Sequence, residues 1–208
     1  MQIHYFGLSS FKITTREATI ITDPFDKKTG LTPPRGSADI LILSEKNNPF
    51  YSATSGISGE IFRVEDPGEY DLKKVTVTGI PLKQDDRWVS AFLIESEDIK
   101  ILNLSHIKNF NMKDDELESL GEINVLIVPV GGESVLDSTT AAKITEQINP
   151  NIVIPSHYAI PGLTEKLSEA SNFVKIMGGS SESIDKLILK KMELSGDGVK
   201  VIILQPLR

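Results

Sequence analysis

The order of the apolar runs along the chain constrains its fold more than any other feature. In the first half, short runs rich in β-branched and aromatic residues are separated by turn sequences such as Asp23-Pro24 and Asp66-Pro67-Gly68. This spacing is typical of successive β-strands. The predicted strands cover residues 2–6, 11–15, 18–22, 38–44, 60–64, 75–80, 88–95 and 99–104. The first half is therefore expected to be mostly β-structure.

After Ser105 the pattern changes, and strands begin to alternate with helices. Apolar runs at 125–130, 151–155 and 199–204 predict buried strands. One helix is predicted between an N-cap at Asp137 or Ser138 and a stop at Asn149-Pro150. Two more are predicted around residues 163–170 and 184–188. A β-rich half followed by alternating strands and helices predicts a single α/β domain over residues 1–208.

Composition limits the chemistry that the chain can support. It has 208 residues, a net charge of -7, three histidines and no cysteine. The absence of cysteine excludes disulfides, thiolate nucleophiles and thiolate metal sites, and three histidines limit any imidazole-rich site. Lys and Arg are scattered in an acidic chain, which argues against nucleic-acid or anionic-membrane partners. With no long apolar stretch and no basic, apolar leader, a cytoplasmic protein is expected.

Polar residues stand at the ends of several predicted strands, at Asp23, His106 and His157. In α/β proteins the ends of strands commonly face the crevice that binds ligands. A carboxylate there can equally form an Asx-turn, and a histidine can satisfy backbone groups. Taken alone, each position is more typical of such a structural role. His4 lies within a predicted strand, which favours a packed or surface role.

Several segments, taken in order, resemble the metallo-β-lactamase fold, in its branch of small hydrolases similar to ascorbate-6-phosphate lactonase. The matching segments are residues 3–11, 20–25 and 38–44, then Pro67-Gly68-Glu69-Tyr70, and finally residues 127–132 and 153–158. They are spread over nearly all of residues 1–160. The resemblance implies an α/β fold that is a four-layer α/β/β/α sandwich, with a cleft at one edge of the sheets.

The same resemblance exposes a departure in the loop that holds the family's two zinc ions. The family has His-x-His-x-Asp-His there, whereas this chain has Glu45-Lys46-Asn47-Asn48-Pro49-Phe50, so all four ligand positions are changed. His106 stands where the bridging aspartate would fall, and only Asp23 and His157 match. Since a catalytic zinc normally keeps three protein ligands, the di-zinc site is expected to be absent and no cofactor is expected.

These departures predict a catalytically inactive member that binds an unknown small molecule or protein. The alternative is a hydrolase of a phosphorylated sugar lactone or phosphodiester with a rebuilt zinc or manganese site of Glu45, His106 and His157, with Asn47 nearby. Asp23 would then orient a ligand, and His157 would bind metal or act as a general acid or base. A third hypothesis is a structural subunit paired with an active relative, because proteins that it resembles commonly form homo-oligomers.

Overall fold

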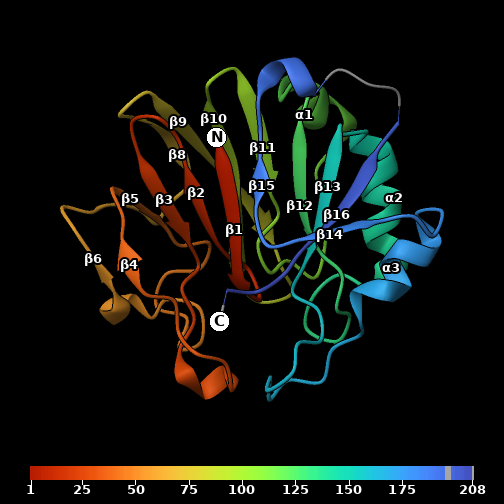
Figure 1. The fold of residues 1–208 in the computed structure, drawn as a ribbon, viewed down its shortest axis with the longest axis horizontal. Helices are drawn as coiled ribbons and strands as arrows, with labels where there is room; N and C mark the ends of the chain where they lie inside the picture. Colours follow the sequence, from red (N-terminus) through yellow and green to blue (C-terminus); the bar gives the residue numbers. More distant parts are fainter. Residues whose placement is uncertain (195–197, 208) are drawn as a thin grey trace.

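The computed structural model describes residues 1–194 and 198–207 and contains two β-sheets that face each other (Figure 1). The first sheet has the strand order β15-β1-β2-β3-β5-β7. Its strands are β1 (Gln2–Gly7), β2 (Ser10–Thr14), β3 (Thr19–Thr22), β5 (Ile40–Ile42), β7 (Phe62–Val64) and β15 (Leu187–Ile188). Strands β3, β5 and β7 run parallel, so their carboxyl ends meet at one edge.

The second sheet has the order β14-β16-β13-β12-β11-β10-β9-β8. Its strands are β8 (Gly68–Leu72), β9 (Val75–Lys83), β10 (Trp88–Ser96), β11 (Ile99–Asn103), β12 (Val125–Pro129), β13 (Ile152–Ser156), β14 (Glu182–Ile184) and β16 (Lys200–Leu204). Strands β11, β12 and β13 are parallel, as expected where helical connections separate them.

The three α-helices of the described residues lie on the second sheet: α1 (Asp114–Ser119), α2 (Ser138–Ile148) and α3 (Ala170–Ile176). Helix α2 starts where predicted, because the Asp137 carboxylate accepts hydrogen bonds from the backbone N–H groups of Thr139 and Thr140. It ends at Asn149, whose left-handed backbone closes the last turn. Over residues 1–194 and 198–207 the structure also has three 3-10 turns: η1 (Lys27–Thr29), η2 (Thr54–Gly56) and η3 (Lys191–Glu193). In the described part of the chain, no helix is long and apolar enough to cross a membrane.

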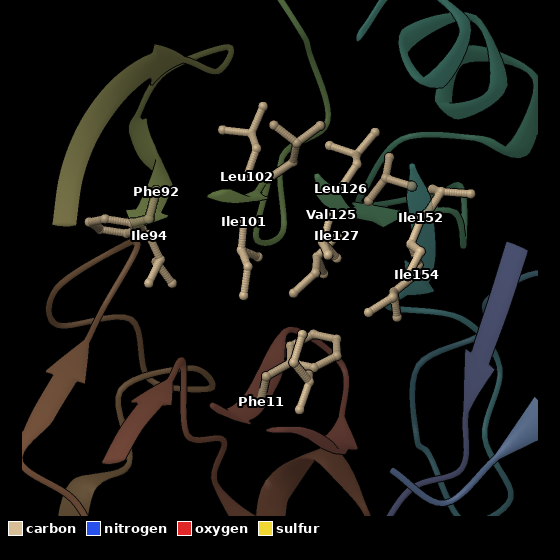
Figure 2. Packing of buried hydrophobic residues seen from close by; sticks show 14 of the residues in the cluster. Phe11, Phe92, Ile94, Ile101, Leu102, Val125, Leu126, Ile127, Ile152 and Ile154 are labelled. Atoms are coloured by element: carbon tan, nitrogen blue, oxygen red, sulfur yellow. The ribbon is translucent and has the colours of Figure 1, made fainter. Parts of the chain in front are cut away.

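The main core fills the space between the sheets (Figure 2). Phe11 of the first sheet faces Ile101 and Ile127 of the second, whereas Leu102 and Leu126 point to the opposite side, toward the helices. Successive residues of a strand alternate between faces, so one sheet supplies apolar groups to both layers. These side chains are buried on both faces of the sheet, and β12 is accordingly a continuous apolar run.

The outer face of the first sheet is covered in a different way. Among the described residues no α-helix lies there, and the short pair β4 (Gly36–Ser37) and β6 (Ile57–Ser58) covers it instead. A second apolar cluster forms beneath this pair from Ile21, Ala38, Leu41, Leu43 and Ile57. The predicted mixed α/β fold with two facing sheets is therefore confirmed, with a small β-layer in the place of one helical layer.

Four details differ from the sequence-based prediction. The predicted helix at 163–170 is irregular, and α3 starts only at Ala170; the predicted helix at 184–188 is replaced by β14 and β15. These strands pair with β16 and β1, so sheet pairing overrides a local apolar pattern that fits a helix. Strand β8 starts at the predicted turn Pro67-Gly68, and α1 starts at Asp114, where no helix is predicted. The Glu116 carboxylate accepts from the backbone N–H of Lys113 at the start of α1.

Candidate functional site

Polar side chains from both sheets meet at the edge where the parallel strands end. Asp23 follows β3, Ser44 and Glu45 follow β5, His106 follows β11, and His157 follows β13. Three of the residues at these bends, Asp23, Ser105 and His157, have a left-handed backbone, with φ of 37°, 56° and 49°. Non-glycine residues in this conformation are strained and gather at ligand-binding and catalytic sites. The backbone thus marks this edge as the candidate site.

A first row of contacts, the His106 row, consists of Asp23, Ser44, His106 and Glu45. Oδ1 of Asp23 accepts hydrogen bonds from the backbone N–H and the hydroxyl of Ser44, both at 2.8 Å. The Ser44 hydroxyl lies 3.2 Å from Nδ1 of His106, and Nε2 of the same ring lies 3.1 Å from Oε2 of Glu45. Both nitrogens of His106 therefore face a protein partner.

Glu45 is the most strongly bound carboxylate of the site. Its Oε2 atom accepts from Arg87 Nη1 at 2.6 Å and from Asn48 Nδ2 at 2.7 Å, in addition to the His106 contact. Burial acts to raise the pKa of Glu45, but the hydrogen bonds from His106, Asn48 and Arg87 outweigh it and lower the pKa to about 2. Glu45 is thus a carboxylate anion held by its neighbours at neutral pH.

A second row, the His157 row, consists of Ser9, His157, Glu165 and Ser134. The Ser9 hydroxyl lies 3.0 Å from Nδ1 of His157, and Oε2 of Glu165 lies 3.6 Å from Nε2. Ser134 donates a hydrogen bond to the other oxygen of Glu165. Burial lowers the pKa of His157, and Glu165 opposes this shift only in part. The buried imidazole is therefore favoured in its neutral form.

Tyr51 contacts both histidines. Its ring centroid is 4.6 Å from that of His106 and 5.5 Å from that of His157, while the two imidazole centroids are 6.4 Å apart. Its hydroxyl lies 3.4 Å from Nε2 of His157. Burial, followed by the charge of Glu165, raises the pKa of the phenol, so Tyr51 is a neutral group there. The phenol ring packs against both imidazoles, and its hydroxyl lies beside Nε2 of His157.

The predicted site residues are only partly brought together. Glu45 contacts His106, and Asp23 is joined to His106 through Ser44, but His157 belongs to the other row. Asn47 is exposed, and its buried neighbour Asn48 makes the contact with Glu45. Asp23 does not cap a local turn, because its Oδ1 atom binds Ser44 on a neighbouring strand end. Its burial raises the pKa of the carboxyl, against the influence of His106 and Ser44.

Sequence reasoning missed Tyr51, Arg87 and Glu165. Glu165 lies in the segment predicted to be a helix, where a glutamate is expected on the solvated face. Arg87 lies in a polar turn between β9 and β10. The only signal at Tyr51 is the aromatic pair Phe50-Tyr51 in a loop rich in Asn, Pro and Ser. None of these local patterns identifies the partner, since each partner comes from a distant part of the chain.

The donor set of this site does not match a zinc centre. In the described part of the chain, no group of three or more His, Asp or Glu side chains is placed to hold a metal ion. A zinc ligand needs a free imidazole lone pair, yet Nδ1 and Nε2 of both His106 and His157 face serine, tyrosine or glutamate side chains. Arg87, bound to Glu45, adds a positive charge beside that carboxylate.

Comparison with known proteins places these features in a family context. Residues 2–157 match the model of the beta-lactamase superfamily domain. A relative from Thermococcus onnurineus, named a UPF0173 metal-dependent hydrolase, is 23% identical over 229 residues, covering 93% of this chain and 98% of that protein. A relative from a Geobacillus strain with the same family name is 25% identical over 197 residues, covering 76% of this chain and 85% of that protein.

Solved structures with a similar fold include proteins named as metallo-hydrolases. A suggested Zn-dependent hydrolase of the metallo-beta-lactamase superfamily from Thermotoga maritima has a TM-score of 0.83 and 27% identity, and the match covers 98% of this chain and 97% of that one. Igni18, a metallo hydrolase from Ignicoccus hospitalis, has a TM-score of 0.69 at 14% identity, covering 99% and 95% of the two chains. The second likeness shows the fold alone.

Proposed function

Since the chain belongs to the beta-lactamase superfamily and has the metallo-β-lactamase fold, we propose that it is a non-catalytic member that binds a small molecule or a protein without metal. Relatives of this chain are named metal-dependent hydrolases, so hydrolysis with a bound metal is the activity to weigh against this proposal. Fold alone does not transfer an activity when the residues of the site differ. The proposal therefore depends on the site of this chain.

One observation carries the proposal: the groups that would bind a metal already bind one another. Glu45 forms a salt bridge with Arg87 and contacts His106. His157 contacts Ser9, Tyr51 and Glu165. The imidazoles of His106 and His157 are 1% and 0% exposed. A metal would have to break several of these contacts and displace Tyr51, which opposes the free energy of binding.

Isothermal titration with zinc and with manganese tests the proposal directly. We expect no stoichiometric metal binding with a dissociation constant below about 1 μM, which corresponds to a binding free energy of roughly 8 kcal/mol. The His157→Ala and Glu45→Gln variants serve as matched controls for weak surface binding. Stoichiometric binding below that limit in the native chain, abolished in both variants, would overturn the proposal.

A second candidate function is hydrolysis of a phosphorylated sugar lactone or a phosphodiester. It is favoured by the names of the relatives and by His106 and His157 at one sheet edge. In that case Tyr51 would have to leave so that Glu45, His106 and His157 could share a metal. A panel of lactone, phosphodiester and β-lactam substrates, with and without zinc or manganese, separates the two. Turnover that disappears on chelation and in His157→Ala supports the hydrolase.

A protein partner, or a second copy of the chain, is the other occupant compatible with the proposal. Light scattering measures the mass in solution, and a pull-down from the source cell identifies a bound relative. A complex with an active relative would assign the chain a structural role in that assembly.

A further inference from the structure

The outer face of the first sheet carries a histidine between two lysines. Ile3 and Tyr5 of β1 are fully buried in the core between the sheets, so His4, which lies between them, points to the outer face. Strand β1 lies between β2 and β15. Lys12 is the cross-strand partner of His4 on β2, and Lys186 directly precedes β15. The fold thus gathers three basic side chains from distant parts of the sequence.

This part of the outer face is open to solvent. The short pair β4 and β6 covers an apolar cluster that includes Ile21 of β3 and Leu41 of β5, and no α-helix of the described residues lies on this side of the molecule (Figure 1). Lys186 is exposed, and His4 and Lys12 are partly exposed. A ligand in solution can therefore reach all three basic side chains.

The two lysines have no acidic partner. Over residues 1–194 and 198–207, no salt bridge or hydrogen bond involves the ammonium group of Lys12 or of Lys186. Elsewhere on the surface lysines are paired, as Lys73 is with Asp39 at 2.5 Å. An unpaired ammonium group remains available to an anion from solution.

The charges that act on His4 are both positive. Burial, followed by the charges of Lys12 and Lys186, lowers the pKa of His4, and no carboxylate of the described residues opposes them. Asp185, the acidic residue next to Lys186, lines a surface hollow beside Phe6 instead. Like charges on neighbouring strands cost free energy, and an anion bound between them offsets that cost. The cluster therefore favours an anion over any other ligand.

His4 can also donate a hydrogen bond. Its Nδ1 atom is buried and has no hydrogen-bond partner within the described chain. A proton on Nδ1 would be a buried donor without an acceptor, so the neutral ring favours a proton on Nε2. Nε2 is not among the buried unpaired atoms and can donate to a group outside the protein. Together with the two ammonium groups, the cluster presents three hydrogen-bond donors.

We propose that His4, Lys12 and Lys186 bind a phosphate-type dianion, either free phosphate or the phosphate group of a monoester. Two ammonium groups match its two negative charges, and lysine binds phosphate as a point charge. Because the contacts are exposed, the affinity should be modest and should fall as salt is added. The site lies on the outer face of the first sheet and not at the edge that holds His106 and His157, so the inference goes beyond the proposed function.

NMR of the His4 ring tests the proposal, and the His4→Gln variant assigns its signals. We suggest titrating the protein with inorganic phosphate while sodium chloride keeps the ionic strength constant. We expect a saturable shift of the His4 signals with a Kd below about 10 mM. Bound phosphate favours the protonated ring, so the pKa of His4 should be higher in phosphate than in chloride by at least about 0.5. No saturable shift, or the same pKa in both salts, would overturn the proposal.

Lysine variants assign the contacts. Lys12→Gln and Lys186→Gln should each weaken phosphate binding about fivefold. In chloride each should also raise the pKa of His4, because a positive charge beside the ring is removed. Lys143→Gln is the matched control, since it makes the same charge change at an exposed position of α2, on the second sheet. It should leave both the affinity and the pKa unchanged.

Lys186→Gln keeps the test valid if Lys12→Gln fails to fold, because Lys186 is fully on the surface. Unchanged phosphate binding in Lys186→Gln, or an equal loss in Lys143→Gln, would reject the site.

Methyl phosphate separates the two sources of the dianion. If it moves the same His4 signals at a lower concentration than inorganic phosphate, the site is that of a phosphate monoester. If it binds more weakly, the site is that of the free ion. Either result supports the anion site.

Discussion

The two histidine rows have the same plan but differ in how firmly they are held. In each row an imidazole lies between a serine at Nδ1 and a glutamate at Nε2. In the His106 row the glutamate is 3.1 Å away and is bound by Arg87 and Asn48. In the His157 row it is 3.6 Å away, and Tyr51 competes for the same nitrogen.

This difference suggests that the His106 row stabilises the fold, whereas the His157 row can rearrange more easily. The His106 row connects strand ends of both sheets, and its two carboxylates, Asp23 and Glu45, accept hydrogen bonds of 2.6 to 2.8 Å, so we expect it to contribute to the stability of the fold. The contacts of Nε2 in the His157 row are long and shared, so we expect that row to rearrange at a smaller cost in free energy. Four substitutions test this contrast.

Asp23→Ala should have the largest effect. The carboxylate is 1% exposed and binds both the backbone N–H and the hydroxyl of Ser44, so its removal leaves two buried donors without an acceptor. We expect the free energy of unfolding to fall by about 3 kcal/mol, measured by urea denaturation. Asp23→Asn keeps an acceptor and should lose less than half as much. Equal losses in the two variants would contradict the role given to Oδ1.

Acid should weaken the His106 row through Glu45. The pKa of Glu45 is about 2 in the folded protein and ordinarily 4.5, so the stabilisation is complete above pH 4.5 and is lost as the pH falls toward 2. Glu45→Gln should be about 2 kcal/mol less stable than the native chain at pH 7. We expect this difference to shrink steadily below pH 4.5 in chemical denaturation. A difference that is constant from pH 7 to pH 3 would be inconsistent with an ionised, bound Glu45.

Ser9→Ala should have a smaller effect, because it removes one neutral hydrogen bond to His157 Nδ1. We expect a loss of about 1 kcal/mol in the free energy of unfolding. The ring nitrogen shifts of His157 in NMR spectra should change with it, whereas those of His106 should not. A change at His106 of the same size would show that the two rows act as one network.

Glu165→Gln should have the smallest effect on stability, about 0.5 kcal/mol, because its contact with His157 is long and the carboxylate is 30% exposed. The decisive measurement is the pKa of His157, followed by NMR titration. Glu165 raises the pKa of His157 against the larger effect of burial, so the variant should titrate at a lower pH than the native chain. An unchanged titration would remove Glu165 from the His157 row.

Much of the fold could be predicted from sequence because its signals are local. The runs that became β9, β10 and β12 alternate or stay apolar as strands do, and Asp137 is a typical N-cap for α2. Strand β15 could not be predicted in the same way, since two residues become a strand only by pairing with β1 at the other end of the chain. A short edge strand depends on tertiary contacts rather than on its own sequence.

The site was predictable in part for the same reason. Asp23, His106 and His157 could be identified because strand ends are visible in the sequence and the ends of parallel strands meet. Their partners could not be identified, because Tyr51, which packs against both imidazoles, is marked by no periodic pattern. The choice between Asn47 and Asn48 depends on a left-handed turn at Asn47, whose φ is 65°. Such a turn cannot be placed from residue types alone.

The bends at Leu8 and His157 join the two sheets through the main chain. Both residues have a left-handed backbone, and the His157 N–H donates to the Leu8 carbonyl oxygen at 2.9 Å. Such a conformation costs about 1 kcal/mol per residue, and here main-chain bonding between the two sheets holds it, independently of either side chain. The side chains at this edge can therefore be exchanged over evolutionary time, or by a protein engineer, while the frame that presents them stays in place.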